Sequence, residues 1–229
     1  MKLLFIPAAG ATKESWFFQT SYFKDSEGVD LPGHPEGKPC TNVDDYVEWL
    51  HDYISTRGFK EVVLAGLSLG GAITLLYGLK YPDDLKAIIL IGTGARLRVH
   101  PSYLEQLKKA VEDKENWVKE SLDTTNTPFP PEISAAITKK KVKMGPEVVL
   151  NDMLCCDTFD IMDKVHQIKI PTLIINGTED VMTFVKYAQY LHDKIEGSQL
   201  VIIEEAGHGV AMQKPKEVNA AIESFLQSL

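Results

Sequence analysis

Short apolar runs alternate along this chain with longer segments in which apolar residues recur at helical spacing. The runs predict strands at Leu3–Ile6, Val29–Leu31, Val62–Ala65, Ala87–Ile91, Thr172–Ile175 and Leu200–Ile203, of which Val29–Leu31 is the weakest. The third, fourth and sixth runs are nearly continuous in Val, Ile, Leu and Ala, which is typical of strands buried on both faces. The alternation predicts an α/β fold in which helices flank a mostly parallel six-stranded sheet.

For three helices of this predicted core, the sequence contains residues that typically begin or end a helix. Thr41 and Asp44 form a candidate capping box for the first helix, and Gly58 ends it. The second helix follows Ser68 and stops at Pro82, while Pro215 suits the first turn of the third. The apolar stripes consist of Val43, Tyr46, Val47, Leu50 and Ile54 in the first helix, Ala72, Ile73, Leu76 and Leu79 in the second, and Val218, Ile222, Phe225 and Leu226 in the third.

One long interval interrupts the alternation. About 80 residues separate the fourth run from the fifth, far more than a single crossover helix needs. Helical patterns cover 103–118 and 146–156, with a breaker stretch at 127–131 between them. Residues 95–170 hold 12 Lys and Arg against 12 Asp and Glu, so the rest of the chain carries the whole net charge of -8. The pattern predicts a helical cap at 95–170, inserted into an α/β core formed by 1–94 and 171–229.

Charge and composition limit the kinds of partner that we expect this protein to bind and the cellular compartment in which we expect it. A net charge of -8 argues against nucleic acid and anionic membranes as partners, and no apolar run approaches the length of a membrane span. The apolar stretch at the N-terminus ends at Pro7, which is too short for the core of an export signal. We therefore expect a cytoplasmic protein in which Cys40, Cys155 and Cys156 are reduced thiols. Lys139, Lys140 and Lys141 with Lys143 form a basic cluster, which we interpret as a solvated helix face, with a patch for an anionic partner as the alternative.

The strongest chemical signal is the segment Gly66-Leu67-Ser68-Leu69-Gly70, which lies between a predicted strand and a predicted helix. A serine at such a sharp turn has strained backbone geometry, and its hydroxyl projects above the sheet. Glycines two residues to either side leave room for the turn, and the helix that follows presents free N–H groups. We interpret Ser68 as a nucleophile, with an N-capping serine in an ordinary glycine-rich turn as the alternative.

A serine nucleophile needs a base and an acid that orients the base. Of six histidines, His208 stands out because it lies in the loop that leaves the C-terminal end of the strand at 200–203, where functional residues of open α/β sheets gather. The others, His34 among them, are interpreted as surface or structurally satisfied residues. Asp180 follows the strand at 172–175 and is the acid candidate, with Glu179 as its rival. The alternative role for either carboxylate is to cap the next helix.

Several loop motifs occur together in one order. Ser68, Asp180 and His208 follow one another, each after a strand, and His208 lies in Ala206-Gly207-His208. The stretch Asp30-Leu31-Pro32-Gly33-His34 begins within the second predicted strand and forms the loop after it, and Phe5-Ile6-Pro7-Ala8-Ala9-Gly10 with Trp16 does the same for the first. Over nearly its whole length the chain resembles the α/β-hydrolase superfamily, whose cap occupies the place of the long insertion.

The resemblance implies a carboxylesterase-like serine hydrolase with a helical cap and a small-molecule ester substrate. In this family Ser68 would be the nucleophile, His208 the general base and Asp180 the residue that orients the histidine. The backbone N–H groups of Ala9 and Leu69 would form the oxyanion hole. Lactone, thioester or carbon–carbon bond hydrolysis on the same triad is the alternative, as is a receptor that binds a ligand without turnover.

The chain departs from the family's pattern at two places. Pro7-Ala8 replaces the usual His-Gly of the oxyanion loop, although a backbone donor at Ala9 does not depend on its side chain. The first predicted strand corresponds to the family's third, so we expect an exposed sheet edge that a homodimer would cover. The segment Gly92-Thr93-Gly94 lacks the third glycine of a dinucleotide-binding turn, and no His or Cys spacing fits a metal site. We therefore expect no cofactor.

Overall fold

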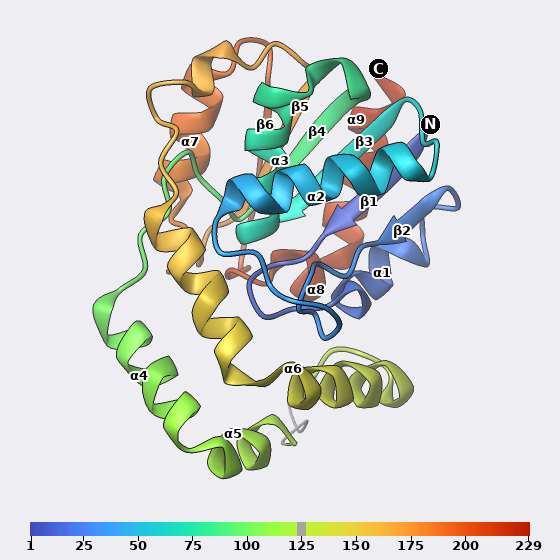
Figure 1. The fold of residues 1–229 in the computed structure, drawn as a ribbon. Helices are drawn as coiled ribbons and strands as arrows, with labels where there is room; N and C mark the ends of the chain where they lie inside the picture. Colours follow the sequence, from blue (N-terminus) through green and yellow to red (C-terminus); the bar gives the residue numbers. More distant parts are fainter. Residues whose placement is uncertain (123–126) are drawn as a thin grey trace.

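Six strands, all paired in parallel, form one sheet in the computed structural model, which describes residues 1–122 and 127–229 (Figure 1). Their order across the sheet is β2-β1-β3-β4-β5-β6. The strands are β1 (Lys2–Ile6), β2 (Ser26–Gly28), β3 (Val62–Leu67), β4 (Leu85–Ile91), β5 (Thr172–Gly177) and β6 (Gln199–Ile203). The predicted α/β class and the predicted number of strands are confirmed.

The weak strand predicted at 29–31 is displaced in the sequence. β2 comprises Ser26–Gly28 at the edge of the sheet and pairs only with β1. Val29 and Leu31 follow it and are buried in the core, with the Val29 N–H still bonded to the Phe5 carbonyl at 3.0 Å. The prediction for residues 29–31 was therefore wrong, because the apolar residues mark where the chain enters the core and not where it pairs.

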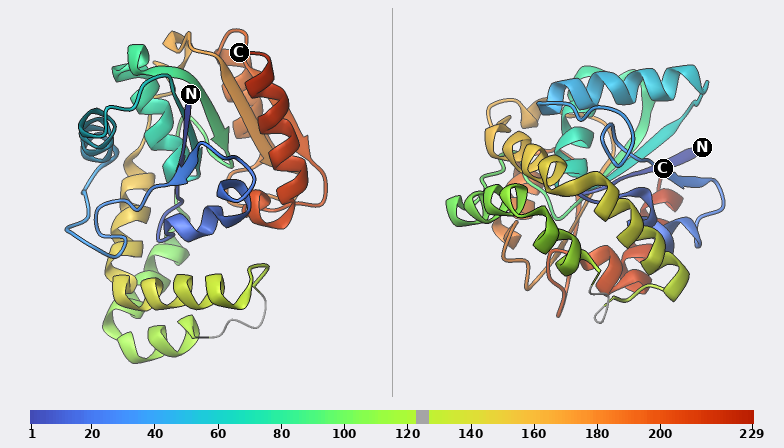
Figure 2. Two further views of the ribbon diagram at one scale, coloured as in Figure 1. Left: turned by 90° about the vertical axis from the view of Figure 1, so that its right-hand side faces the viewer. Right: turned by 60° about the horizontal axis from the view of Figure 1, so that its bottom comes forward.

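Helices cover both faces of the sheet, as Figure 2 shows in its left view with α2 on one side and α9 on the other. The α-helices are α1 (Phe17–Thr20), α2 (Val43–Thr56), α3 (Leu69–Lys80), α4 (Pro101–Glu112), α5 (Lys114–Ser121), α6 (Pro131–Thr158), α7 (Val185–Lys194), α8 (Val210–Gln213) and α9 (Pro215–Gln227). Short 3₁₀ turns are formed by η1 (Lys13–Trp16), η2 (Pro82–Asp84) and η3 (Val165–Gln167).

The core divides into two layers because side chains alternate between the faces of each strand. In β1, Leu4 and Ile6 belong to the layer that also contains residues of α2, α3 and α7, whereas Leu3 and Phe5 belong to the layer that contains residues of α8 and α9. Trp16 joins the second layer and stacks on Phe5 with 4.8 Å between the ring centroids. Both faces are therefore buried at β3 and β4, as their continuous apolar runs predicted. The same prediction was wrong for the run at 200–203, because β6 lies at the edge of the sheet and most of its residues are only half-buried.

The first core helix, α2, has its N-cap one residue later than predicted. Asn42 is the N-cap of α2, and its side chain accepts the Asp45 N–H at 2.8 Å. Asn42 has extended backbone angles, φ -156° and ψ 168°, as an N-cap requires. The predicted capping box of Thr41 and Asp44 was wrong by one position. Thr41 and Asn42 are both good N-cap residues, and only the backbone conformation shows that Asn42 is the cap.

The long insertion forms α4, α5 and α6, which lie below the sheet in Figure 1. The single helix predicted over 103–118 is divided at Asp113, which caps α5 through the Asn116 N–H at 3.1 Å. Gly145, with φ 73° and ψ 168°, interrupts α6 just before Pro146. A small apolar cluster joins these helices through Leu107, Met144, Val148, Val149 and Met153. The division into core and cap stays a prediction, and residues 123–126 of the predicted cap lie outside the described residues.

The basic cluster on α6 is not a merely solvated face. Lys140 pairs with Asp30 at 2.6 Å and with Glu14 at 2.7 Å, and Lys143 pairs with Glu36. Lys141 lies 5.0 Å from the centroid of the Trp117 ring. Lys140 and Lys143 therefore connect the insertion electrostatically to loops of the N-terminal half. Within the described residues, no helix is long and apolar enough to cross a membrane.

Candidate active site

Ser68 lies at the sharp turn between β3 and α3. Its backbone angles are φ 55° and ψ -113°, a region that residues other than glycine rarely adopt. The turn is fixed by two hydrogen bonds, from the Ser68 N–H to the Ile91 carbonyl at 3.0 Å and from the Thr93 hydroxyl to the Ser68 carbonyl at 2.9 Å. The strain is thus held in place by the neighbouring strand β4 and the residues that follow it.

The two glycines of the motif are required by close backbone approach. A Cβ on Gly66 would lie 2.1 Å from the Gly70 carbonyl oxygen, and one on Gly70 would lie 2.3 Å from the Ile6 carbonyl oxygen. No side chain fits at those distances. The turn can therefore bring the start of α3 against the end of β1, which places Leu69 close to the loop that contains Ala9.

His208 and Asp180 meet at the carboxyl ends of β6 and β5. His208 Nδ1 lies 2.9 Å from Asp180 Oδ2, and the carboxylate side chain is 1% exposed. Because a carboxylate can only accept, Nδ1 carries the hydrogen and Nε2 keeps a free lone pair. Asp180 also accepts the Met182 and Thr183 N–H groups through Oδ1, so it both orients the histidine and stabilises its own loop. Glu179, its rival, is exposed and makes no hydrogen bond to His208 within the described part of the chain.

Two residues that support this pair were missed by the sequence analysis. The Thr183 hydroxyl donates to Asp180 Oδ2 at 2.7 Å and lies 3.2 Å from His208 Nδ1. The side chain of Gln213 accepts the Gly207 N–H at 2.7 Å, next to His208. A hydroxyl three residues after an aspartate is a common local hydrogen-bonding pattern, which could have indicated Thr183. No comparable signal indicates Gln213.

The Ser68 turn and the His208–Asp180 pair approach each other beside Gly92. A Cβ on Gly92 would lie 3.4 Å from Asp180 Oδ2 and 3.5 Å from His208 Nδ1. Gly92 directly follows Ile91, to which the Ser68 N–H is bonded. Across the described residues, no hydrogen bond joins the Ser68 hydroxyl to the histidine or the aspartate. Catalytic hydrogen bonds of this kind often form only when substrate is bound.

The two predicted oxyanion donors are the backbone N–H groups of Ala9, in the loop after β1, and of Leu69, at the start of α3. Ala9 lies in a four-residue turn closed by the Ala11 N–H on the Ala8 carbonyl at 3.1 Å. Leu69 is the first residue of α3, so its N–H has no partner within the helix. Among the backbone hydrogen bonds of the described residues, neither N–H is a donor. Both groups are therefore available to a ligand.

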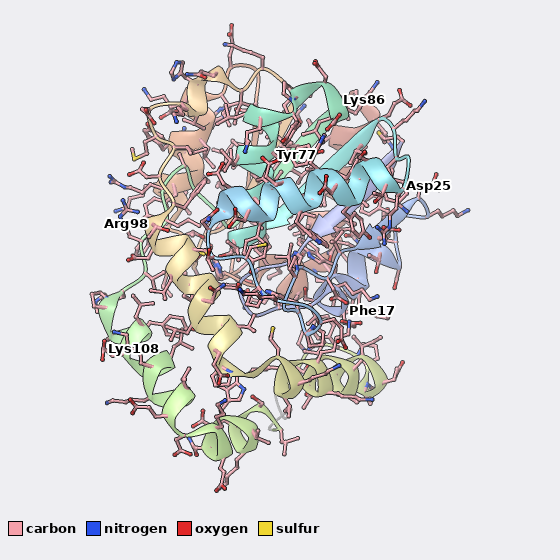
Figure 3. All side chains as sticks on the ribbon, viewed as in Figure 1. Phe17, Asp25, Tyr77, Lys86, Arg98 and Lys108 are labelled. Atoms are coloured by element: carbon pink, nitrogen blue, oxygen red, sulfur yellow. The ribbon has the colours of Figure 1, made fainter. Side chains whose placement is uncertain are left out.

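A cavity of about 620 Å³ opens beside Ser68. Its walls come from the segment that joins β4 to α4, from α6 and from the loop after Asp180, and they are mostly apolar. The lining residues are Ser68, Leu97, Arg98, Val99, His100, Pro101, Tyr103, Met153, Cys156, Val181, Met182, Thr183, Phe184 and Tyr187. Arg98, labelled in Figure 3, is fixed to α6 by a bond to the Asp157 carbonyl at 2.7 Å. The cavity has the size of typical small-ligand sites.

We expect part of the acid sensitivity of this protein to come from Asp180. Burial alone would raise the pKa of Asp180, but the hydrogen bonds from His208 and Thr183 and the charge of His208 lower it below its ordinary value of 3.8. A carboxylate with a lowered pKa in the folded state stabilises the protein above its unfolded pKa. That contribution is lost as the pH falls through the folded pKa. Urea denaturation from pH 7 to about pH 2, which extends below the ordinary pKa of 3.8, should therefore show a smaller loss of stability in Asp180→Asn.

Glu179→Gln is the matched control for that measurement, since it removes a neighbouring exposed carboxylate and keeps the buried one. It should follow the stability profile of the unaltered protein. An Asp180→Asn profile as steep as that of the unaltered protein would contradict the role of the buried carboxylate.

Metal chemistry has no evident site here. Within residues 1–122 and 127–229, no group of three or more His, Cys, Asp and Glu side chains is arranged to hold an ion. Burial raises the pKa of Cys40 to about 11 and that of Cys155 to about 12, so neither is an activated thiolate. The expected absence of a cofactor stays a prediction.

Several known proteins are similar to this chain in sequence and in fold. The sequence profile of the alpha/beta hydrolase family matches residues 3–221. A pimeloyl-[acyl-carrier protein] methyl ester esterase from Neisseria meningitidis is 25% identical over 213 residues, 88% of this chain and 68% of that protein. A monoacylglycerol lipase of Rattus norvegicus is 25% identical over 228 residues, 88% of this chain and 67% of that protein. The solved structure of a thermophilic esterase is 31% identical with a TM-score of 0.80, and covers 99% of this chain and 90% of its own.

Proposed function

This chain belongs to the alpha/beta hydrolase family and is an esterase-like enzyme, and we propose that it cleaves carboxylic esters of small or medium size through an acyl-enzyme on Ser68. The observation that carries the proposal is the bond from His208 Nδ1 to Asp180 Oδ2 beside the strained Ser68 turn. A buried carboxylate, an oriented imidazole and a serine at the mouth of an apolar cavity together favour acyl transfer.

In the first step, Ser68 Oγ attacks the carbonyl carbon of the ester and His208 Nε2 takes the serine proton. Asp180 holds the tautomer that leaves Nε2 free, and it stabilises the imidazolium that forms. The N–H groups of Ala9 and Leu69 bind the negative oxygen of the tetrahedral intermediate, and each such donor contributes on the order of 3 kcal/mol. When the intermediate collapses, the alkoxide takes the proton from His208 and leaves as the alcohol.

In the second step, His208 removes a proton from water, which attacks the acyl group on Ser68. The tetrahedral intermediate again uses the two backbone donors. Its collapse returns the proton to Ser68 Oγ and releases the carboxylic acid. No group other than side chains, backbone N–H groups and water is needed.

The apolar cavity supports a substrate with a hydrocarbon part of limited length. Burial of one methylene contributes about 0.8 kcal/mol, which corresponds to about a fourfold gain in kcat/KM. We expect kcat/KM on 4-nitrophenyl esters to rise from acetate to acyl chains of about six to eight carbons, and then to fall once the cavity of about 620 Å³ is full. Steady-state kinetics on a series from acetate to palmitate measures this, with Ser68→Ala as the blank.

Met153→Ala tests whether this cavity sets the preference, because Met153 lines it. The optimum should move to longer chains. Met144→Ala is the matched control: Met144 is buried on the same helix and does not line the cavity. An unchanged optimum in Met153→Ala would contradict the assignment of the cavity, whereas no turnover of any ester by the folded enzyme would contradict the proposed activity. Lactones, thioesters and ligand binding without turnover would then be tested.

A further inference from the structure

A carboxylate that takes no part in the proposed reaction lies completely buried on α6. Asp152 is 0% exposed; its Oδ1 accepts the Tyr46 hydroxyl at 2.8 Å, and its Oδ2 accepts the Gly10 N–H at 2.8 Å. The ring of His34, also 0% exposed, places Nε2 3.0 Å from Asp152 Oδ2, an ion-pair contact outside hydrogen-bond alignment. Groups from three separate parts of the chain thus converge on one buried charge, which is costly to bury without partners.

The Gly10 N–H belongs to the turn at 8–11 that contains Ala9. The Ala11 N–H closes this turn on the Ala8 carbonyl, and Gly10 has φ 63°, as the third position of a type II turn requires. The Ala8 carbonyl and the Ala9 N–H share one peptide plane and point in opposite directions. The geometry of the turn therefore sets the direction in which the Ala9 N–H points.

The turn is held from two sides by the same buried pair. Asp152 binds the Gly10 N–H, and His34 Nδ1 donates to the Ala11 carbonyl at 2.6 Å. Helix α6 also packs closely against the turn, because a Cβ on Gly10 would lie only 2.8 Å from Val149 Cγ2. The loop cannot rotate without breaking at least one of these contacts.

The surroundings of His34 favour a positive charge on its ring, beside Asp152. A carbonyl oxygen can only accept, so Nδ1 carries a hydrogen, and the carboxylate beside Nε2 favours a second one. Burial alone would lower the pKa of His34, but the contact with Asp152 and the bond to Ala11 raise it above its ordinary value of 6.5. The surroundings of the His34 ring therefore favour its protonated form.

We propose that Asp152 and His34 are positioning residues that clamp the turn at 8–11 and so aim the Ala9 N–H at the oxyanion. The inference rests on the proposed function, because it assigns these residues to the oxyanion hole of that reaction. Met153, next to Asp152, lines the substrate cavity. Helix α6 thus connects the cavity wall to the oxyanion turn.

Asp152→Asn tests the clamp with almost no change of shape. An amide cannot accept all the hydrogens that converge on the carboxylate, and it does not pair with a charged His34. We expect kcat on the preferred 4-nitrophenyl ester to fall about 10- to 100-fold, less than the 10²- to 10³-fold that loss of an oxyanion donor costs. KM should stay within about twofold, because the Ala9 N–H acts mainly on the transition state.

Tyr46→Phe is the matched control, because it removes a hydrogen bond to Oδ1 of the same carboxylate, whereas the turn is bound by Oδ2. Both variants should unfold at lower urea concentrations, but only Asp152→Asn should lose kcat. Equal losses of kcat in the two variants would mean that Asp152 only stabilises the fold, and they would overturn the proposal. If Asp152→Asn fails to fold, His34→Gln replaces it, since it removes the charge beside Asp152, and the same loss of kcat is expected.

Hydrogen exchange separates this inference from the proposed function, because it needs no turnover. A peptide that contains Gly10 and Ala11 should exchange faster in Asp152→Asn than in the unaltered protein, and Tyr46→Phe should leave its exchange unchanged. Faster exchange in an enzyme without esterase activity would support the clamp and contradict the proposed reaction. Unchanged exchange in Asp152→Asn would overturn the clamp even if the enzyme hydrolyses esters.

Discussion

Replacement of Ser68 by alanine is expected to lower kcat for ester hydrolysis on the order of 10⁴-fold or more, with little change in stability. The substitution removes the atom that forms the acyl-enzyme. The hydrogen bonds that hold the turn use the Ser68 backbone and not its hydroxyl, so they survive. Steady-state turnover of the preferred ester, together with urea denaturation of both proteins, measures the two effects.

Ser198→Ala is the control for this experiment. Ser198 is also a buried serine, and its hydroxyl bonds to His192 instead of lying at the cavity. It should keep its activity. Turnover by Ser68→Ala at a rate close to that of the unaltered enzyme would contradict the assignment of the nucleophile. Loss of activity together with unfolding would instead identify Ser68 as a structural residue.

Gly66→Ala is expected to destabilise the protein by about 3 kcal/mol or more, or to prevent folding. The new Cβ would lie 2.1 Å from the Gly70 oxygen and 2.6 Å from the Gly71 nitrogen, which are both backbone atoms of the turn. Backbone at the start of a buried helix cannot move aside as a flexible side chain can. The free energy of unfolding from urea denaturation measures the effect.

Gly58→Ala separates this steric effect from the general cost of replacing a glycine. Gly58 has φ 64°, and nothing lies within 4 Å of a Cβ there, so only backbone strain of about 1 kcal/mol is expected. A Gly66→Ala protein as stable as Gly58→Ala would contradict the close approach at the Ser68 turn.

The strands were predictable where burial is complete. Val62–Leu67 and Leu85–Ile91 are buried almost throughout, so their apolar runs were direct signals. Ser26–Gly28 has no such pattern, because an edge strand is defined by its hydrogen bonds to β1 and not by its side chains. The insertion was readable as helical, but the break at Gly145 comes from a backbone conformation that the sequence only permits.

The candidate site also contains residues that the sequence identifies and residues that only the fold distinguishes. Ser68 was identifiable from adjacent residues, because the motif around it is local. Asp180 and Glu179 are neighbours with the same chemistry, and only the fold buries one carboxylate against His208 and leaves the other in solvent. Whether the three groups act as a triad stays a prediction, which the Ser68→Ala and ester experiments test.

The fold class, the turn that carries Ser68 and the order of Ser68, Asp180 and His208 could be predicted from the amino-acid sequence, because they follow from local patterns of burial and backbone freedom. The support of the histidine by Thr183 and the enclosure of the turn at 8–11 by Asp152 and His34 arise only when the chain is folded. Asp152 lies 142 positions from Gly10 in the sequence. No local sequence pattern can indicate such contacts, because they depend on how the insertion packs against the sheet and on which charges that packing buries.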